Sequence, residues 1–166
     1  MRCVSRAARA LVDEDLAVDL VCTSGRVLSR CPMPQRVKFV HLAGNLQDER
    51  WMQALATCKQ LRSIVINNCT NLPRMVGTVL LSCPQLQSAD FPLCVNLTDA
   101  SVEALSKCPQ LQSVNFSCCE NLTDAEALSR CPQLQSVNFS LCENLTDASV
   151  EALSEKCAER RVSPKW

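Results

Sequence analysis

The chain has 166 residues, enough for one domain with its own core. Its 17 basic and 17 acidic side chains cancel, and only 4 % of its residues are aromatic, with no Tyr. A neutral chain with so few rings gives no reason to expect nucleic acid or an anionic membrane as a partner. We therefore expect no nucleic-acid binding and no membrane binding.

The first 30 residues differ in character from the rest of the chain. The apolar run after Met1 is broken by three acidic residues at 13–15, which argues against a secretory signal. Between residues 11 and 30, apolar side chains recur at helix-like intervals, from Leu16 to Leu28. We predict an N-terminal helical capping segment over residues 1–30, which covers the apolar end of the rest of the chain.

From residue 31 onward the sequence repeats itself. The hexapeptide Cys-Pro-Gln-Leu-Gln-Ser starts at residues 83, 108 and 131, and looser copies start at Cys58 and Cys31. The steps from Cys58 through residues 83, 108 and 131 to Cys157 are 25, 25, 23 and 26 residues. A fixed period of this length indicates stacked supersecondary units, because one unit cannot bury its own apolar face.

Each copy opens with an apolar-x-x-apolar-x-apolar frame. Its last four residues alternate, which predicts a short strand with one buried face. The frame is occupied by Val37, Val40, Leu42; Leu61, Ile64, Ile66; Leu86, Ala89, Phe91; Leu111, Val114, Phe116; and Leu134, Val137, Phe139.

The second half of a copy reads Asn-Leu-Thr-Asp and then a helical segment, as in residues 96–107 and 144–155. Thr or Asp is a natural helix N-cap, since its side-chain oxygen accepts from free backbone donors. The copy that starts at Cys108 lacks two residues of this segment. We expect its helix to shrink to a loop or a tight turn, with Thr123 and Glu126 at capping-box spacing, while the strand register survives.

The pattern Cys-Pro-x-Leu-x-x-Val-x-Phe-x-x-Cys-x-x-Leu-Thr-Asp, best seen at residues 108–124 and 131–147, closely resembles the cysteine-containing subfamily of leucine-rich repeats. The resemblance implies an α/β solenoid, with a parallel sheet on the concave side and short helices on the convex side. We expect about five repeats over residues 31–157, behind the helical cap. A charged C-terminal tail, residues 158–166, should fray.

The same resemblance implies an intracellular protein–protein interaction module that binds its partner on the concave face. In that family such repeats commonly form the substrate-recognition part of F-box proteins in SCF-type ubiquitin ligases, which is the alternative function. Asp15-Leu16 and Val21-Cys22 resemble the end of an F-box, and a Skp1-like adaptor would then be a partner. The usual Leu-Pro opening is missing, so we favour the cap.

Strand positions outside the apolar frame should point to solvent and form the binding surface. The predicted partner-binding residues are Lys38, Phe39, His41, Arg62, Val65, Gln87, Asp90, Gln112, Asn115, Gln135 and Asn138. The first five combine charged and apolar groups, which anchor partners better than amides alone, so we predict the hot spot there. A merely solvated sheet face is the alternative.

The 13 Cys residues are odd in number and recur at fixed places of the repeat. We interpret them as reduced thiols buried in the core, which predicts a cytoplasmic or nuclear location. Cys118 departs from the periodic positions and should lie outside the core as the best candidate for a reactive thiol. A Cys-dependent metal or redox protein is the second alternative, but the Cys spacing does not cluster four ligands for zinc.

Catalysis has little support in the sequence. His41 is the only His, no nucleophile motif is placed to pair with it, and the three Gly residues form no phosphate loop. We therefore expect no enzyme activity, no catalytic residues, no metal and no cofactor.

Overall fold

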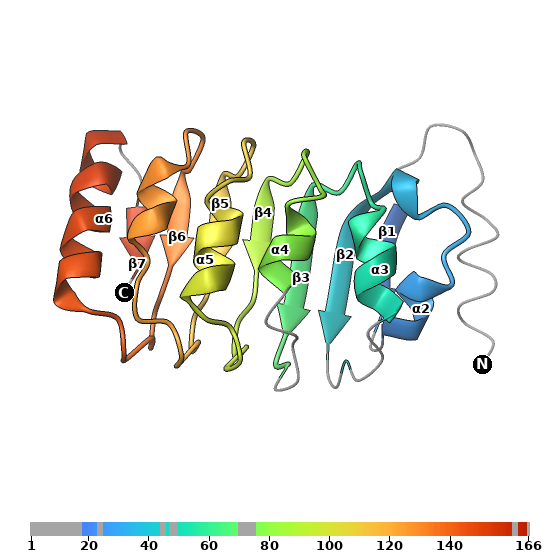
Figure 1. Ribbon diagram of the computed structural model, residues 1–166, viewed down its shortest axis with the longest axis horizontal. Helices are drawn as coiled ribbons and strands as arrows, with labels where there is room; N and C mark the ends of the chain where they lie inside the picture. Colours follow the sequence, from blue (N-terminus) through green and yellow to red (C-terminus); the bar gives the residue numbers. More distant parts are fainter. Residues whose placement is uncertain are drawn as a thin grey trace.

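The computed structural model describes residues 18–22, 25–43, 46, 50–69, 76–160 and 163–165. Helices and strands alternate along the chain, and the strands form one parallel sheet (Figure 1). The elements are β1 (Val18–Cys22), α2 (Gly25–Ser29), η1 (Pro34–Arg36), β2 (Val37–Ala43), α3 (Arg50–Ala56), β3 (Ser63–Asn67), α4 (Val76–Leu80), β4 (Ser88–Asp90), α5 (Asp99–Leu105), β5 (Ser113–Asn115), η2 (Glu126–Arg130), β6 (Ser136–Asn138), α6 (Asp147–Arg160) and β7 (Ser163–Lys165).

The seven strands lie in sequence order, β1 to β7, and every neighbouring pair is parallel. Because successive strands are parallel neighbours, each connection crosses one face of the sheet, and the next strand lies directly beside the previous one. Figure 1 shows the helices in a row on that one face, in front of the sheet. No helix of the described residues covers the opposite face of the sheet, which we call the polar face.

The core lies between the sheet and the row of helices. Every residue of the predicted apolar frame is buried, so the predicted strand faces are confirmed. The leucines that open the frame, Leu61, Leu86, Leu111 and Leu134, are no more than 5 % exposed. Three phenylalanines that close successive frames stack on one another, with ring centroids 5.9 Å apart for Phe91 and Phe116 and 5.6 Å apart for Phe116 and Phe139.

The periodic thiols from Cys58 to Cys157 also lie in the core, as the sequence predicts, and no disulfide joins the cysteines between Cys31 and Cys157. Thiols at the turns after the strands donate to a carbonyl of the preceding unit: Cys94 to Ile66 at 3.1 Å, and Cys119 to Phe91 at 3.2 Å. Burial raises the pKa of the Cys119 thiol to about 12. These side chains therefore behave as small apolar groups with a weak donor that links one unit to the next.

The shortened unit confirms the expected loss of helix. Residues Glu126–Arg130 form one short 3₁₀ helix, η2, and the register between β5 and β6 is kept, with Val114 beside Val137. The capping box is wrong in detail, since no side-chain cap bond forms at η2. The Glu126 amide instead donates its hydrogen bond to Asp124 Oδ1 at 2.8 Å.

The N-terminal segment differs from the helical cap that the sequence predicts. Val18–Cys22 forms β1 and pairs with β2, so the helical prediction is wrong for these residues. Only Gly25–Ser29 is helical among the described residues of this segment. The physical reason is the period-2 alternation of Val18, Leu20 and Cys22, which matches β2 as Leu20 beside Val40. The expectations for residues 1–17 lie outside the described residues.

The C-terminal boundary is also corrected. Helix α6 continues to Arg160, and Ser163–Lys165 adds strand β7 beside β6, so the expected fraying tail from residue 158 is wrong. The Phe139 amide donates to the Lys165 carbonyl at 2.6 Å. The sequence did not indicate this strand, because Ser163–Lys165 has no alternation of apolar and polar residues. Pro164 suits such an edge strand, where one ladder donor is dispensable.

Candidate functional site

The polar face aligns the predicted partner-binding residues in rows that cross the strands. The first row is aligned by backbone hydrogen bonds between residues at the N-terminal ends of neighbouring strands. The other two rows are aligned by the strand register. The rows are Lys38, Arg62, Gln87, Gln112, Gln135; then Phe39, Ser63, Ser88, Ser113, Ser136; then His41, Val65, Asp90, Asn115, Asn138. All 15 side chains are partly or well exposed, so they reach the surface.

The predicted hot spot is one contiguous patch on β2 and β3. Phe39 is 39 % exposed, which is high for an aromatic ring on a sheet. Arg62 donates its backbone amide to the Lys38 carbonyl at 2.7 Å, so these two basic residues are neighbours. His41 lies beside Val65 in the register. The patch thus combines two cations with an exposed ring and an aliphatic side chain.

A polar cluster lies next to this patch. The Asn67 amide nitrogen is 3.0 Å from His41 Nε2, and Asp90 interacts with both His41 and Asn115. Burial raises the pKa of Asp90, although the hydrogen bond from Asn115 and the charge of His41 act in the opposite direction. Asn67 was not among the residues that the sequence predicted for the binding surface. Its position at the end of a predicted strand, next to the His41 strand, was the available signal.

The later rows of the polar face are partly engaged in their own turns. Asn115 Oδ1 accepts the Ser117 amide at 2.9 Å, and Asn138 Oδ1 accepts both the amide and the hydroxyl of Ser140, at 3.0 and 2.7 Å. These amides order the turn after the strand. They offer a partner less than the charged and apolar residues of β2 and β3 offer.

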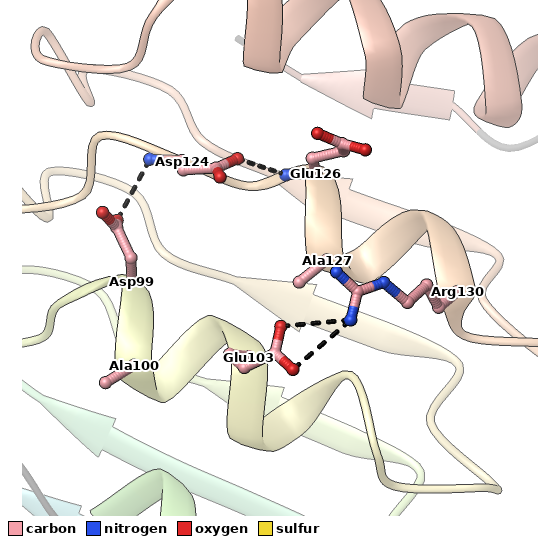
Figure 2. A pocket seen from close by; sticks show the side chains of 7 residues that line it. All are labelled: Asp99, Ala100, Glu103, Asp124, Glu126, Ala127 and Arg130. Carbon is pink, nitrogen blue, oxygen red and sulfur yellow. Dashed lines mark hydrogen bonds and ion pairs between the residues drawn. The ribbon is translucent and has the colours of Figure 1, made fainter.

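The shortened unit leaves a cavity of about 260 Å³ on the helical face (Figure 2). Its charged groups pair with one another: Arg130 Nη1 lies 3.3 Å from both carboxylate oxygens of Glu103, and Asp99 accepts the amides of Thr123 and Asp124 at 2.8 and 3.0 Å. Although burial raises the pKa of Asp99, the hydrogen bond from the Thr123 hydroxyl, at 2.6 Å, together with those from the two amides holds it below its usual value. The cavity residues thereby join α5 to η2.

The Asp99 contacts also change the expected capping of helices. At α5 Thr98 occupies the N-cap position, as the sequence predicts, but its side chain does not form the expected cap bond. At α6 the prediction is confirmed, because Thr146 Oγ1 accepts the Ser149 amide at 3.3 Å. Asp99 instead accepts hydrogen bonds from the amides of Thr123 and Asp124 in the following unit. The sequence of one repeat cannot predict such a contact between two units.

A second cavity, of about 830 Å³, lies between α2 and α3 on the helical face. Three arginines, Arg26, Arg30 and Arg50, line it together with Cys31. Arg26 and Arg30 come from α2 and the residue after it, whereas Arg50 begins α3, so the cavity depends on how these two helices pack against each other. The sequence analysis therefore did not identify this basic cavity.

The described residues contain no group of three or more potential metal ligands placed to share an ion. Within the same part of the chain, no helix has both the length and the apolar character needed to cross a membrane. Cys118 lies outside the buried core and is partly exposed, where the sequence predicts it. Its chemistry is that of an accessible thiol on a turn.

Comparison with known proteins identifies neither a family nor a relative of the chain. No protein-family model matches the chain, and no curated protein resembles it closely enough to count as a relative.

Proposed function

We propose that the chain is a leucine-rich-repeat solenoid that binds another protein through the polar face of its sheet. The repeat period of 23 to 26 residues and the in-register parallel strands support the repeat interpretation. In this proposal the polar face is the concave side. The free thiols of the core support a reducing location, in the cytoplasm or the nucleus.

The observation that carries the binding proposal is the patch on β2 and β3. Phe39 stays exposed beside Lys38 and Arg62, and an exposed ring flanked by cations is typical of an interface anchor. The two cations favour a partner that presents acidic side chains around an apolar group. The amide and hydroxyl rows of β4 to β6 would extend the contact without dominating its energy.

The binding proposal is tested with a paired substitution. Affinity capture from the native cell should recover a partner with the unaltered chain and lose it with Phe39→Ala combined with Arg62→Ala. Lys107→Ala on the helical face, an exposed cation, is the matched control and should retain the partner. Circular dichroism should show that all variants fold. Equal capture by the unaltered chain and the paired variant contradicts the proposal.

The repeat interpretation has a separate test. Deletion of residues 110–132 removes one unit and joins Pro109 to Gln133, which restores the same hexapeptide. A solenoid tolerates this, because each unit contacts only its neighbours. The shortened protein should unfold cooperatively, with an unchanged helical signal per residue. Loss of the folded state would refute the interpretation.

A further inference from the structure

Four turns after successive strands share an unusual backbone conformation. The residues before the buried turn cysteines, Asn68, Leu93, Cys118 and Leu141, have φ values of 51°, 60°, 59° and 63°. This left-handed region suits Gly and Asn and is unfavourable for a branched side chain such as Leu. Only Asn68 is a residue that tolerates it well. The chain therefore keeps two leucines where a glycine would cost less.

The same leucines are the most exposed large apolar side chains among the described residues. Leu141 is 67 % exposed and Leu93 is 48 % exposed, and Cys118 between them is partly exposed. The turns that carry them are hydrogen-bonded to one another: the Leu93 amide donates to the Ser117 carbonyl and the Cys118 amide to the Ser140 carbonyl, both at 2.9 Å. The three side chains form an apolar row across adjacent turns, which we call the turn row.

The turn hydrogen bonds explain the backbone conformation but not the side chains. A glycine or an asparagine would make the same amide bond with less strain. Exposed leucines at strained positions gain nothing from the core, since they lie outside it. Strain that the fold itself does not need is typical of a functional surface.

We propose that the turn row docks a basic amphipathic helix of a partner protein. Adjacent strands lie about 4.8 Å apart, so the members of the row recur at nearly the rise of one helical turn, about 5.4 Å. A helix lying across the strands can therefore place one apolar residue between successive members, at i, i+3 or i+4, and i+7. The turn row adjoins the ends of β4 to β6, and none of its residues belongs to the patch on β2 and β3. The proposal therefore does not depend on the function of that patch.

Acidic residues beside the turn row indicate that the partner helix should be basic. Glu120 and Glu143 are exposed and stand two residues after Cys118 and Leu141. Residues 92–96, 117–121 and 140–144, which form the three turns, contain no Lys or Arg. A second copy of the chain would bring these carboxylates against each other, which disfavours self-association. Lys or Arg beside the apolar stripe of a helix would instead pair with both glutamates.

The test uses two helical peptides of about 18 residues, or five turns, with the same Leu, Lys and Ala composition. One places its leucines on one face with lysines beside them, and the other scatters them around the helix. The patterned peptide should bind, measured by fluorescence polarisation, and should slow alkylation of Cys118 followed by mass spectrometry. The scattered peptide should do neither. Absence of binding by the patterned peptide, or equal binding by both, overturns the proposal.

Substitutions then separate the turn row from other surfaces. Leu93→Asn combined with Leu141→Asn should weaken the patterned peptide at least about tenfold, because Asn keeps the backbone and removes the apolar contact. Leu81→Asn, at a leucine that is 40 % exposed outside the row, is the matched control and should leave binding unchanged. Phe39→Ala with Arg62→Ala should also leave it unchanged. An equal loss with Leu81→Asn overturns the proposal.

A stability measurement tests the strain argument itself. Leu93→Gly and Leu141→Gly should each raise the urea midpoint, since Gly adopts the left-handed region freely, while peptide binding falls. A lower midpoint in both variants would show that the leucines serve the fold, and it would overturn the proposal.

Discussion

The stacked phenylalanines offer a direct test of how neighbouring units stabilise one another. Phe116 and Phe91 are both fully buried, but Phe116 stacks on two described rings, whereas Phe91 stacks on Phe116 alone among the described residues. A buried Phe→Ala change costs about 3–5 kcal/mol, and an aromatic pair adds about 0.5–1.5 kcal/mol beyond burial. Phe116→Ala should therefore destabilise the protein more than Phe91→Ala does, by about one aromatic pair, ~0.5–1.5 kcal/mol.

The assay is urea unfolding followed by far-UV circular dichroism, with reductant present throughout to keep the thiols free. A double-mutant cycle with both changes isolates the pair, and its coupling energy should be about 0.5–1.5 kcal/mol. Phe39→Ala, at an exposed ring, is the control and should cost less than about 1 kcal/mol. Equal costs for the two buried rings, or zero coupling, would refute the account of stacking between units.

Three further predictions concern pH, the shortened unit and a close contact. Because burial raises the pKa of Cys58 and Cys119 to about 12, folded thiols keep protons that unfolded thiols lose near pH 9. The free energy of unfolding should hold below about pH 9 and fall above it, measured by urea titration at about pH 8 and pH 10. Inserting Ser-Val after Ala125 should convert η2 to an α-helix and deepen the dichroism at 222 nm; an unchanged signal would contradict this. Gly77→Ala should lower the melting temperature, because its Cβ would lie 2.8 Å from Ser101 Cα, with a cost of about 1–3 kcal/mol. An unchanged melting temperature would show that the contact relaxes freely.

The strand register was predictable because buried and exposed strand positions require apolar and polar residue types, which alternate visibly in the sequence. Ala89, Val114 and Val137 recur in one frame and lie side by side in β4, β5 and β6, and a shift by one residue would move each of them to the polar face. The shortening of η2 was predictable for the same reason, since two missing residues cannot be absorbed by a helical face. Apolar spacing therefore predicted both features.

Features made by the backbone could not be predicted in this way. Strand β7 pairs through the carbonyl of Lys165, in a segment whose proline and charges disfavour a strand. Asp99 bonds the next unit instead of its own helix, which depends on how two units are stacked. The left-handed leucines of the turn row were also missed, because Leu carries no local preference for that conformation.

The sequence predicted correctly that the polar-face residues reach the surface. It did not indicate which of them hydrogen-bond their own turns and which contact a neighbouring strand. Asn115 and Asn138 look alike in the sequence and both order their own turns, but Asn115 also hydrogen-bonds Asp90 of the neighbouring strand. Asp90 occupies the same row, yet it joins a cluster with His41 instead. The difference comes from the neighbouring strand, which local patterns do not describe.

The two-residue deletion makes two adjacent segments of nearly identical sequence differ in the helix that follows each of them. Residues 110–125 and 133–148 differ only at Cys118 and Leu141, so β5 and β6 could exchange places during folding with little loss of strand pairing. The helices after these two strands differ in length: five residues of η2 after β5, and fourteen of α6 after β6. An exchanged chain would have to pack the longer helix against α5, where the shorter η2 packs in the structure. The unequal lengths of these helices therefore distinguish two segments that strand pairing alone would not distinguish.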